Sequence, residues 1–203
     1  MPAADMTPKL GTVIDMIADL FRRRGAEAYL GEDVTQAEHM LQAAALAAAE
    51  DGSDAMIAAA LLHDVGHLVS DAGDDYIERG VDNRHEEAAA RFLAPFFPPE
   101  VVEPIRLHVA TKRYLCAVDP DYRARLSEAS VRTLALQGGP MDPAEAEAFA
   151  RDPHRDQAVK VRLWDEAAKE KGRPTPPFDH WRPVLERLVA AGAGAGGSAA
   201  DAR

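Results

Sequence analysis

The chain has 203 residues, a formal net charge of −11, 47% hydrophobic residues and 28% charged residues. This composition is typical of one folded domain with a sizeable core, and it argues against a nucleic-acid-binding protein, because such proteins concentrate Lys and Arg. The lone cysteine, Cys116, cannot form an internal disulfide, which fits a reducing compartment. We find neither a signal-peptide pattern nor an apolar run of about 20 residues that could span a bilayer. We therefore expect a soluble, cytoplasmic protein that does not bind membranes.

The abundance of alanine and the scarcity of β-branched runs favour an all-α fold. Apolar residues recur at helical spacing over residues 9–24, and Gly25 ends this first helix. Thr35 and Glu38 have the spacing of a capping box, which marks the start of the second helix. In chain order, the patterns predict helices at residues 9–24, 35–50, 54–68, 84–95, 99–112, 122–136, 143–150, 154–171 and 178–190.

The remaining segments carry loop and linker signals. Residues 70–83 are rich in Asp and Gly and are predicted to form a surface loop. Residues 1–8 look like a flexible start, and residues 191–203 have the Ala, Gly and Ser composition of a disordered tail. We find no internal repeat and no convincing strand, so we predict a single domain over residues 9–190.

The adjacent pair His63–Asp64 is the most informative feature of the chain, with His67 four residues after the first histidine. On one helix His63 and His67 share a face, and the adjacent Asp can turn toward the same buried ion. A buried His–Asp pair among Ala and Leu is costly unless something coordinates or pairs it. Imidazole and carboxylate together suit iron, manganese or zinc. The segment therefore predicts a metal site.

Further residues that could converge on this site lie in predicted helices. A single histidine is more often a hydrogen-bonded core residue than a metal ligand, but the whole set with an adjacent His–Asp pair is hard to explain in that way. A single cysteine is too few for a structural zinc site built from thiolates or for an iron–sulfur cluster. His154 and His180 do not fit the pattern and are expected to be structural. The further candidate ligands are His39, His85, His108 and Asp165.

A helical His, then His-Asp, then an Asp about a hundred residues later resembles the pattern of the HD-domain superfamily. Members of this family are helical bundles that hold one or two metal ions in the core. The two additional histidines before the last Asp resemble the dinuclear branch, which implies a central site in which Asp64 bridges two ions. The other implied ligands are His39, His63 and Asp165 for one ion, and His85 and His108 for the other.

The segment ahead of His39 separates two kinds of HD protein. Most members hydrolyse phosphate esters with metal-activated water. The Tyr29-x-x-Glu32 element, followed by Thr35-Gln36, instead closely resembles the corresponding loop of the diiron oxygenases that cleave organophosphonates with O2. In that branch the Tyr covers an open iron position before substrate arrives, and the Glu contacts the substrate amino group. The resemblance therefore implies that Tyr29 and Glu32 are catalytic residues and that Glu32 also binds substrate.

Residues farther along the chain continue the resemblance. His67 matches a family residue of the substrate pocket, which implies that it is both a catalytic and a substrate-binding residue. Lys112 follows His108 by one helical turn, and Arg162 precedes Asp165 by three residues on a shared face. A phosphonate dianion needs fixed cations and hydroxyl donors, although Arg162 could instead form a simple ion pair with Asp165. The expected phosphonate cradle consists of His67, Lys112, Ser130 and Arg162.

The resemblance implies a mixed-valence diiron oxygenase, with one Fe2+ and one Fe3+, that uses O2 to cleave the C–P bond of a 1-hydroxy-2-aminoethylphosphonate-type substrate. The products would be phosphate and an amino acid such as glycine. The main alternative is a metal-dependent HD phosphohydrolase acting on a nucleotide or phosphomonoester, against which Tyr29 and Glu32 weigh. A non-catalytic HD module is disfavoured by the complete ligand set, and a polyol oxygenase would not need both Lys112 and Arg162. The oligomeric state and the methylation of the substrate ammonium stay open.

Overall fold

The computed structural model describes residues 10–29, 31–50, 52–70 and 79–195, and these ranges are helical without a named strand. An isolated antiparallel bridge joins Ala28 to Thr35. The helices are α1 (Leu10–Arg24), α2 (Gln36–Glu50), α3 (Asp54–Leu62), α4 (Val65–Val69), α5 (His85–Leu93), α6 (Pro99–Val118), α7 (Pro120–Ala124), α8 (Glu128–Leu136), α9 (Pro143–Phe149), α10 (Arg155–Ala167) and α11 (Phe178–Ala195).

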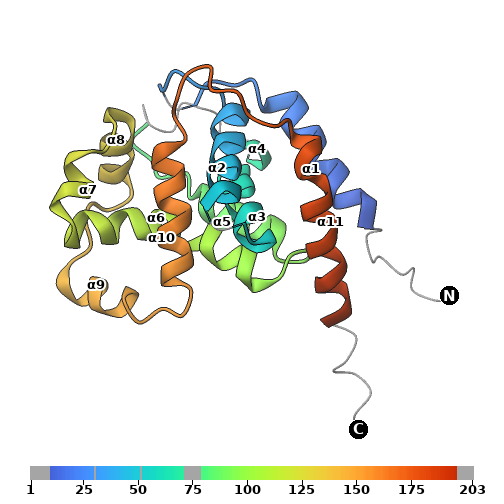
Figure 1. Cartoon of the computed structure of the whole chain (residues 1–203). Helices are drawn as coiled ribbons and strands as arrows, with labels where there is room; N and C mark the ends of the chain where they lie inside the picture. Colours follow the sequence, from blue (N-terminus) through green and yellow to red (C-terminus); the bar gives the residue numbers. More distant parts are fainter. Residues whose placement is uncertain (1–9, 30, 51, 71–78, 196–203) are drawn as a thin grey trace, which may run out of the picture.

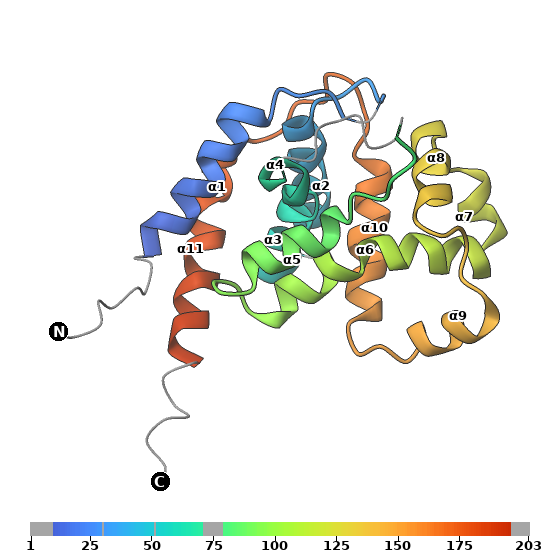
Figure 2. The same ribbon diagram turned by 180° about the vertical axis from the view of Figure 1, so that it is seen from behind.

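The bundle has a central group of helices and two flanks (Figures 1 and 2). Helix α10 packs along α6 and α2, and α2 packs against α3. Helices α1 and α11 lie side by side on one flank, whereas α7, α8 and α9 lie on the other. The functional site described below lies between the central helices and the α8 side.

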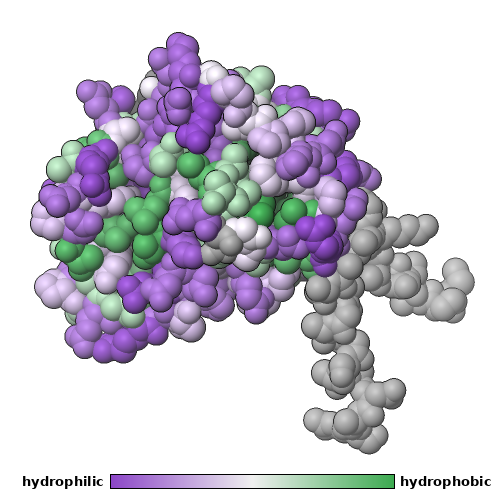
Figure 3. Space-filling view, viewed as in Figure 1, coloured by the Kyte–Doolittle hydropathy of each residue, from purple (hydrophilic) through white to green (hydrophobic). Residues whose placement is uncertain are grey.

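The main core is formed by apolar side chains of the central helices and the α1–α11 flank. Three alanines of α2 and three of α3 are fully buried, which allows these helices to approach closely: Ala43, Ala44, Ala47, Ala58, Ala59 and Ala60. The face in Figure 3 is mostly hydrophilic, and its hydrophobic residues occur in small groups between polar ones. None of the described helices is long and apolar enough to cross a membrane.

The expectation of an all-α chain is confirmed, but the predicted continuous helix over residues 54–68 is wrong. The helix breaks at His63 and Asp64, between α3 and α4, where Asp64 has φ −103° and ψ 10°. Asp favours helix ends over helix interiors, and Gly66 in α4 lies directly against the backbone of His85 in α5. As a result His63 and His67 do not share one helix face and contact different parts of the site.

Other helix boundaries differ because of local caps. The predicted helix at residues 99–112 continues to Val118, and the predicted helix at 122–136 is two helices. Asp119 accepts hydrogen bonds from the backbone N–H groups of Asp121 and Tyr122 to start α7, and Ser127 caps α8. The capping box predicted from Thr35 and Glu38 is present, with hydrogen bonds of 2.8 and 3.2 Å.

The late part of the chain also differs from the predicted ranges. Helix α10 ends at Ala167 and not near residue 171, and α11 continues to Ala195, beyond the predicted domain end at residue 190. Residues 1–9 and 196–203, and most of the loop predicted at 70–83, lie outside the described residues.

Candidate active site

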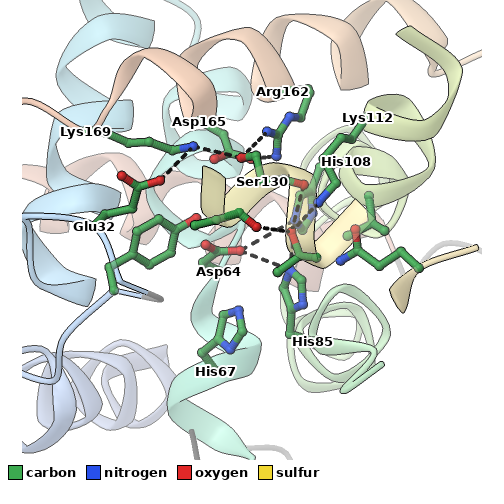
Figure 4. A pocket seen from close by; sticks show the side chains of 15 residues that line it. Glu32, Asp64, His67, His85, His108, Lys112, Ser130, Arg162, Asp165 and Lys169 are labelled. Carbon is green, nitrogen blue, oxygen red and sulfur yellow. Dashed lines mark hydrogen bonds and ion pairs between the residues drawn. The ribbon is translucent and has the colours of Figure 1, made fainter. Parts of the chain in front are cut away.

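The structure brings all six predicted metal ligands together in the middle of the bundle, where each is buried. Figure 4 shows Asp64, His85, His108 and Asp165. The most exposed of them, His85, has only 7% of its surface accessible. They come from five parts of the chain: His39 from α2, His63 and Asp64 from the α3–α4 break, His85 from the start of α5, His108 from α6 and Asp165 from α10.

One cluster surrounds a single oxygen of Asp64. The Nε2 atoms of His39 and His63 lie 3.5 and 3.4 Å from Asp64 Oδ2, and 3.1 Å from each other. Asp165 Oδ1 lies 3.4 Å from His39 Nε2 and 3.9 Å from His63 Nε2. Two ligand atoms that are each about 2.1 Å from an ion, at a right angle, are about 3.0 Å apart. These atoms are therefore close enough to share one ion.

A second cluster surrounds the other oxygen of the same carboxylate. The Nε2 atoms of His85 and His108 lie 3.3 and 3.5 Å from Asp64 Oδ1, and 3.0 Å from each other. The two oxygens of Asp64 thus face two different histidine pairs. One carboxylate placed in this way can bridge two ions.

The far ring nitrogen of each ligand histidine contacts an oxygen acceptor. An Nδ1–H that donates a hydrogen bond leaves the lone pair on Nε2, which is the nitrogen that faces Asp64. This arrangement prepares all four rings for metal coordination. The acceptors are the carbonyl of Ala168 for His39 (2.9 Å), of Ala60 for His63 (2.8 Å) and of Ile105 for His108 (2.7 Å), and the side-chain oxygen of Asn83 for His85 (3.0 Å).

Two carboxylate oxygens in these clusters are buried and have no hydrogen-bond partner in the described part of the chain: Asp64 Oδ1 and Asp165 Oδ1. A buried carboxylate oxygen without a partner is costly, and coordination to an ion removes that cost. Imidazole nitrogens with carboxylate oxygens and no thiolate suit first-row transition metals such as iron or manganese. The residues therefore fit a dinuclear metal centre.

Both carboxylates are charged despite their burial. Burial opposes the ionisation of Asp64, but the neighbouring His63 and further histidines hold its pKa well below the ordinary value. Burial likewise opposes the ionisation of Asp165, and the Arg162 guanidinium outweighs it, so this pKa is also well below the ordinary value. Two buried anions side by side attract a cation.

The histidines respond to these charges in different ways. Burial and the neighbouring His67 ring lower the pKa of His85 to about 3, so this imidazole is neutral, as a metal ligand must be. Burial also lowers the pKa of His39, but Asp165 and Asp64 outweigh it and raise the value to about 9. A proton on His39 therefore takes the place of a cation in the metal-free cluster. Metal binding must release this proton and becomes tighter as pH rises.

A cavity lies beside the two clusters, and all of the predicted substrate and catalytic residues line it (Figure 4). Its wall joins the metal clusters to three cationic side chains, two of which were predicted. The predicted lining residues are Tyr29, Glu32, His67, Lys112, Ser130 and Arg162.

Tyr29 lies directly over the first metal cluster. Its ring stacks on His39, with ring centroids 3.9 Å apart and an interplanar angle of 17°. Burial and the carboxylates of Asp64 and Asp165 raise the pKa of the phenol well above the ordinary value. Glu32, three residues later, has one buried oxygen, Oε1, that accepts no hydrogen bond in the described structure. The two side chains therefore both lie at the cavity, and the catalytic and substrate-binding roles that the resemblance implies for them stay predictions.

Lys112 is a buried cation of the cavity wall with 3% of its surface accessible. Its Nζ donates a hydrogen bond of 2.9 Å to Thr133 Oγ1. Burial and the nearby Arg162 lower its pKa to about 7. A bound dianion would favour the charged form.

Arg162 forms the ion pair that the sequence left open. Its guanidinium donates to Asp165 and Glu166, to the hydroxyl of Tyr122 at 2.7 Å and to Ser130 Oγ at 3.4 Å. Two carboxylates therefore neutralise this cation, and it orients Asp165. Binding of a phosphonate by Arg162 stays a prediction.

Lys169 is a cavity residue that the sequence reasoning missed. Its Nζ lies 3.0 Å from Ser130 Oγ, 3.0 Å from Glu166 Oε1 and 3.7 Å from Glu32 Oε1. The sequence signal that could have identified Lys169 is its position four residues after the predicted ligand Asp165. Lys169 thus connects the predicted phosphonate end of the cavity, at Ser130, with Glu32.

Three further residues at the site also escaped the sequence reasoning. Thr133 and Gln137 line the cavity from α8 and the residue after it, at helical spacing from Ser130. Asn83 contacts two histidines from the segment before α5. Thr133 and Gln137 follow Ser130 by three and seven residues, a spacing that could have identified them as sharing its helix face. No motif pointed to Asn83.

The comparison with protein families agrees with this geometry. The model of the HD domain matches residues 37–142, which include five of the six predicted ligands, Asp64 among them. The chain belongs to the HD-domain family. This HD protein is 46% identical to the [1-hydroxy-2-(trimethylamino)ethyl]phosphonate dioxygenase (glycine-betaine-forming) of Leisingera caerulea, over 88% of the chain and 91% of that protein. It is 42% identical to the hydroxymethylphosphonate dioxygenase of Gimesia maris, over 88% of the chain and 89% of that protein.

Proposed function

We propose that this HD protein is a mixed-valence diiron oxygenase that cleaves the C–P bond of a 1-hydroxy-2-aminoethylphosphonate-type substrate. The observation that carries the proposal is the double cluster around Asp64 beside a cavity with cationic walls. The similarity to two proteins named as phosphonate dioxygenases supports oxidative C–P cleavage over phosphate-ester hydrolysis. In the overall reaction the C–P bond breaks, C1 becomes a carboxylate and phosphorus leaves as phosphate, with one O2 as the four-electron oxidant.

The metal centre is assigned to the six buried ligands. When bound, two iron ions would supply the redox chemistry and an open position for O2. Asp64 would bridge them, with His39, His63 and Asp165 on one side and His85 and His108 on the other. The hydrogen bonds that each Nδ1–H donates keep the four imidazoles in the tautomer that coordinates through Nε2.

The phosphonate is assigned to the end of the cavity near α8. Lys112, Lys169 and the Ser130 hydroxyl would donate hydrogen bonds to its oxygens, with Arg162 adding positive charge beside Asp165. Each hydrogen bond to a charged group contributes about 1.5–3 kcal/mol. A dianion also restores the positive charge that burial disfavours on Lys112.

The ammonium group is assigned to Glu32, whose buried Oε1 lacks a hydrogen-bond donor in the described structure. Glu32 shares its loop with Tyr29, which covers the first metal cluster. The loop turns at Gly31, where φ is +83° and glycine is favoured. A movement of Glu32 toward a substrate ammonium would therefore draw Tyr29 with it, so that the centre opens to O2 only when substrate is bound.

The experiment that tests this function measures phosphate release by iron-loaded protein from three 1-hydroxyphosphonates, with a primary amine, a trimethylammonium group or no amine. We expect release from the primary amine substrate in air and none without O2. The phosphohydrolase would be supported instead by two results together. Manganese- or magnesium-loaded protein would release phosphate from a phosphomonoester without O2, and it would release no phosphate from the phosphonates.

A further inference from the structure

We propose that Asn83 is a positioning residue that sets the tautomers of two histidines at once: His85, a metal ligand, and His67, a substrate donor. The role of His85 as a metal ligand rests on the proposed function, and the role of His67 in substrate binding is the one that the family resemblance implies. The tautomers follow from the contacts of Asn83 alone. Asn83 lies in the segment before α5, and its carboxamide reaches both rings.

The orientation of the carboxamide follows from a backbone contact. Asn83 Oδ1 lies 3.0 Å from His85 Nδ1 and 3.4 Å from the backbone N of His85. A backbone N–H can only donate, so the oxygen of the carboxamide must face His85. The NH2 group then faces His67, where Asn83 Nδ2 lies 3.2 Å from His67 Nδ1.

This orientation determines where each ring carries its proton. His85 donates from Nδ1 and keeps a lone pair on Nε2, which lies 3.3 Å from Asp64 Oδ1. His67 accepts at Nδ1, so its neutral ring carries the proton on Nε2. The two rings stack with centroids 4.2 Å apart and an interplanar angle of 18°.

The backbone beside Asn83 adopts a rare conformation that supports this geometry. Arg84, the next residue, has φ 48° and ψ 43°, and it is the single non-glycine residue with positive φ in the described ranges. Non-glycine residues persist in this region only where their surroundings hold them. One such contact is the hydrogen bond of 3.2 Å from the Arg84 N–H to Asp82 Oδ1. The turn directs the Asn83 side chain toward α4 while α5 begins at His85.

The tautomer separates two roles that distance alone would allow for His67. A ring nitrogen of His67 lies within 4.8 Å of ligand atoms of Asp64 and His85, so the three could be taken for a metal site. Coordination through Nε2 would require the proton on Nδ1, where it would oppose the NH2 group of Asn83. His67 therefore acts as an N–H donor to an oxygen of the substrate, not as a further ligand.

Two substitutions separate the two contacts of Asn83. Asn83→Asp keeps the acceptor for His85 but replaces the NH2 group by an oxygen, so a neutral His67 must place its proton on Nδ1. We expect two ions per chain as in the unmodified protein, with KM for the phosphonate raised about 10- to 100-fold by the loss of one hydrogen bond to an anion. Asn83→Ala removes both contacts, and metal affinity should also fall about 10- to 100-fold.

The effect of Asn83→Asp on KM must act through His67. A double-mutant cycle tests this requirement. In a His67→Ala background, Asn83→Asp should change KM less than twofold, because the donor is already absent. Equal effects of Asn83→Asp on KM in both backgrounds would show a general structural role and overturn the proposal.

Imidazole 15N NMR of histidine-labelled, zinc-loaded protein without substrate reads the tautomers directly. We expect His67 to be protonated on Nε2 in the unmodified protein and on Nδ1 in Asn83→Asp. His67 protonated on Nδ1 in the unmodified protein, or still protonated on Nε2 in Asn83→Asp, would contradict the proposal. This readout does not depend on the reaction, so it separates a wrong tautomer assignment from a wrong proposed function, which would instead show as an absence of phosphonate oxidation.

Discussion

Gly66→Ala should remove one of the two metal ions and leave the other. A Cβ atom at Gly66 would lie 1.9 Å from the carbonyl oxygen of His85, 2.7 Å from its carbonyl carbon and 3.1 Å from the backbone N of Ala89. All three atoms belong to the backbone of α5, so no side-chain rotation can relieve the contact. Helix α5 must move away from α4.

The size of this movement follows from the same distances. Ordinary contact begins at 3.4 Å, so the His85 carbonyl must retreat by the difference between 3.4 and 1.9 Å, which is 1.5 Å. Metal–ligand distances tolerate only about 0.2 Å. Overpacking of this kind costs about 1–3 kcal/mol, which for a chain of this size lowers Tm by about 2–12 °C. The ion between His85 and His108 should be lost, because His85 Nε2 moves with its backbone.

Metal analysis and thermal unfolding of the purified variant check this prediction. We expect a decrease from two ions per chain to one, with a folded protein of lower Tm. Leu93→Ala is the matched control, because Leu93 is fully buried in α5, the helix that Gly66→Ala displaces. Its truncation costs about 2–5 kcal/mol of stability, and Leu93 is not one of the predicted metal ligands. Gly66→Ala protein with two ions at full affinity would show that α5 does not move as described, and loss of an ion in Leu93→Ala would show that the effect is not specific to Gly66.

Three further perturbations test other parts of the site. Asp64→Ala should lose both ions in metal analysis, and loss of one alone would show that the bridge is placed wrongly. Lys112 has a pKa of about 7, so it loses its charge as pH rises through this value. We therefore expect kcat/KM for the phosphonate to fall as pH rises above about 7. In Lys112→Met, kcat/KM should be lower and should not change with pH in this range. Glu32→Gln should raise KM at least tenfold for a phosphonate with an ammonium group and hardly at all for hydroxymethylphosphonate, and an equal rise for both would exclude Glu32 as the ammonium partner.

Much of the site could be predicted from residue types and spacing. The ligands are His and Asp residues in helix patterns that are otherwise apolar, where such residues need a partner, and their order resembles a known family. The similarity of the chain to two phosphonate dioxygenases confirms that resemblance. The element Tyr29-x-x-Glu32 was informative for the same reason, because it is a local pattern.

The features that were missed depend on contacts between distant segments. The break at Asp64 requires the approach of Gly66 to α5, and local helix propensity does not report it. Lys169 reaches Glu32 only because the chain after α10 returns to the loop before α2. Asn83 is an ordinary loop residue in the sequence, and its importance appears only when His67 and His85 are placed on either side of its carboxamide.

Oxidative C–P cleavage is tested most directly by a simultaneous measurement of O2 uptake and phosphate release by iron-loaded protein. The substrate is a 1-hydroxy-2-aminoethylphosphonate, and the amino acid product is quantified in the same reaction. We expect one phosphate and one amino acid for each O2 consumed, and no phosphate in an anaerobic reaction. Phosphate release that continues at the same rate without O2 would contradict it.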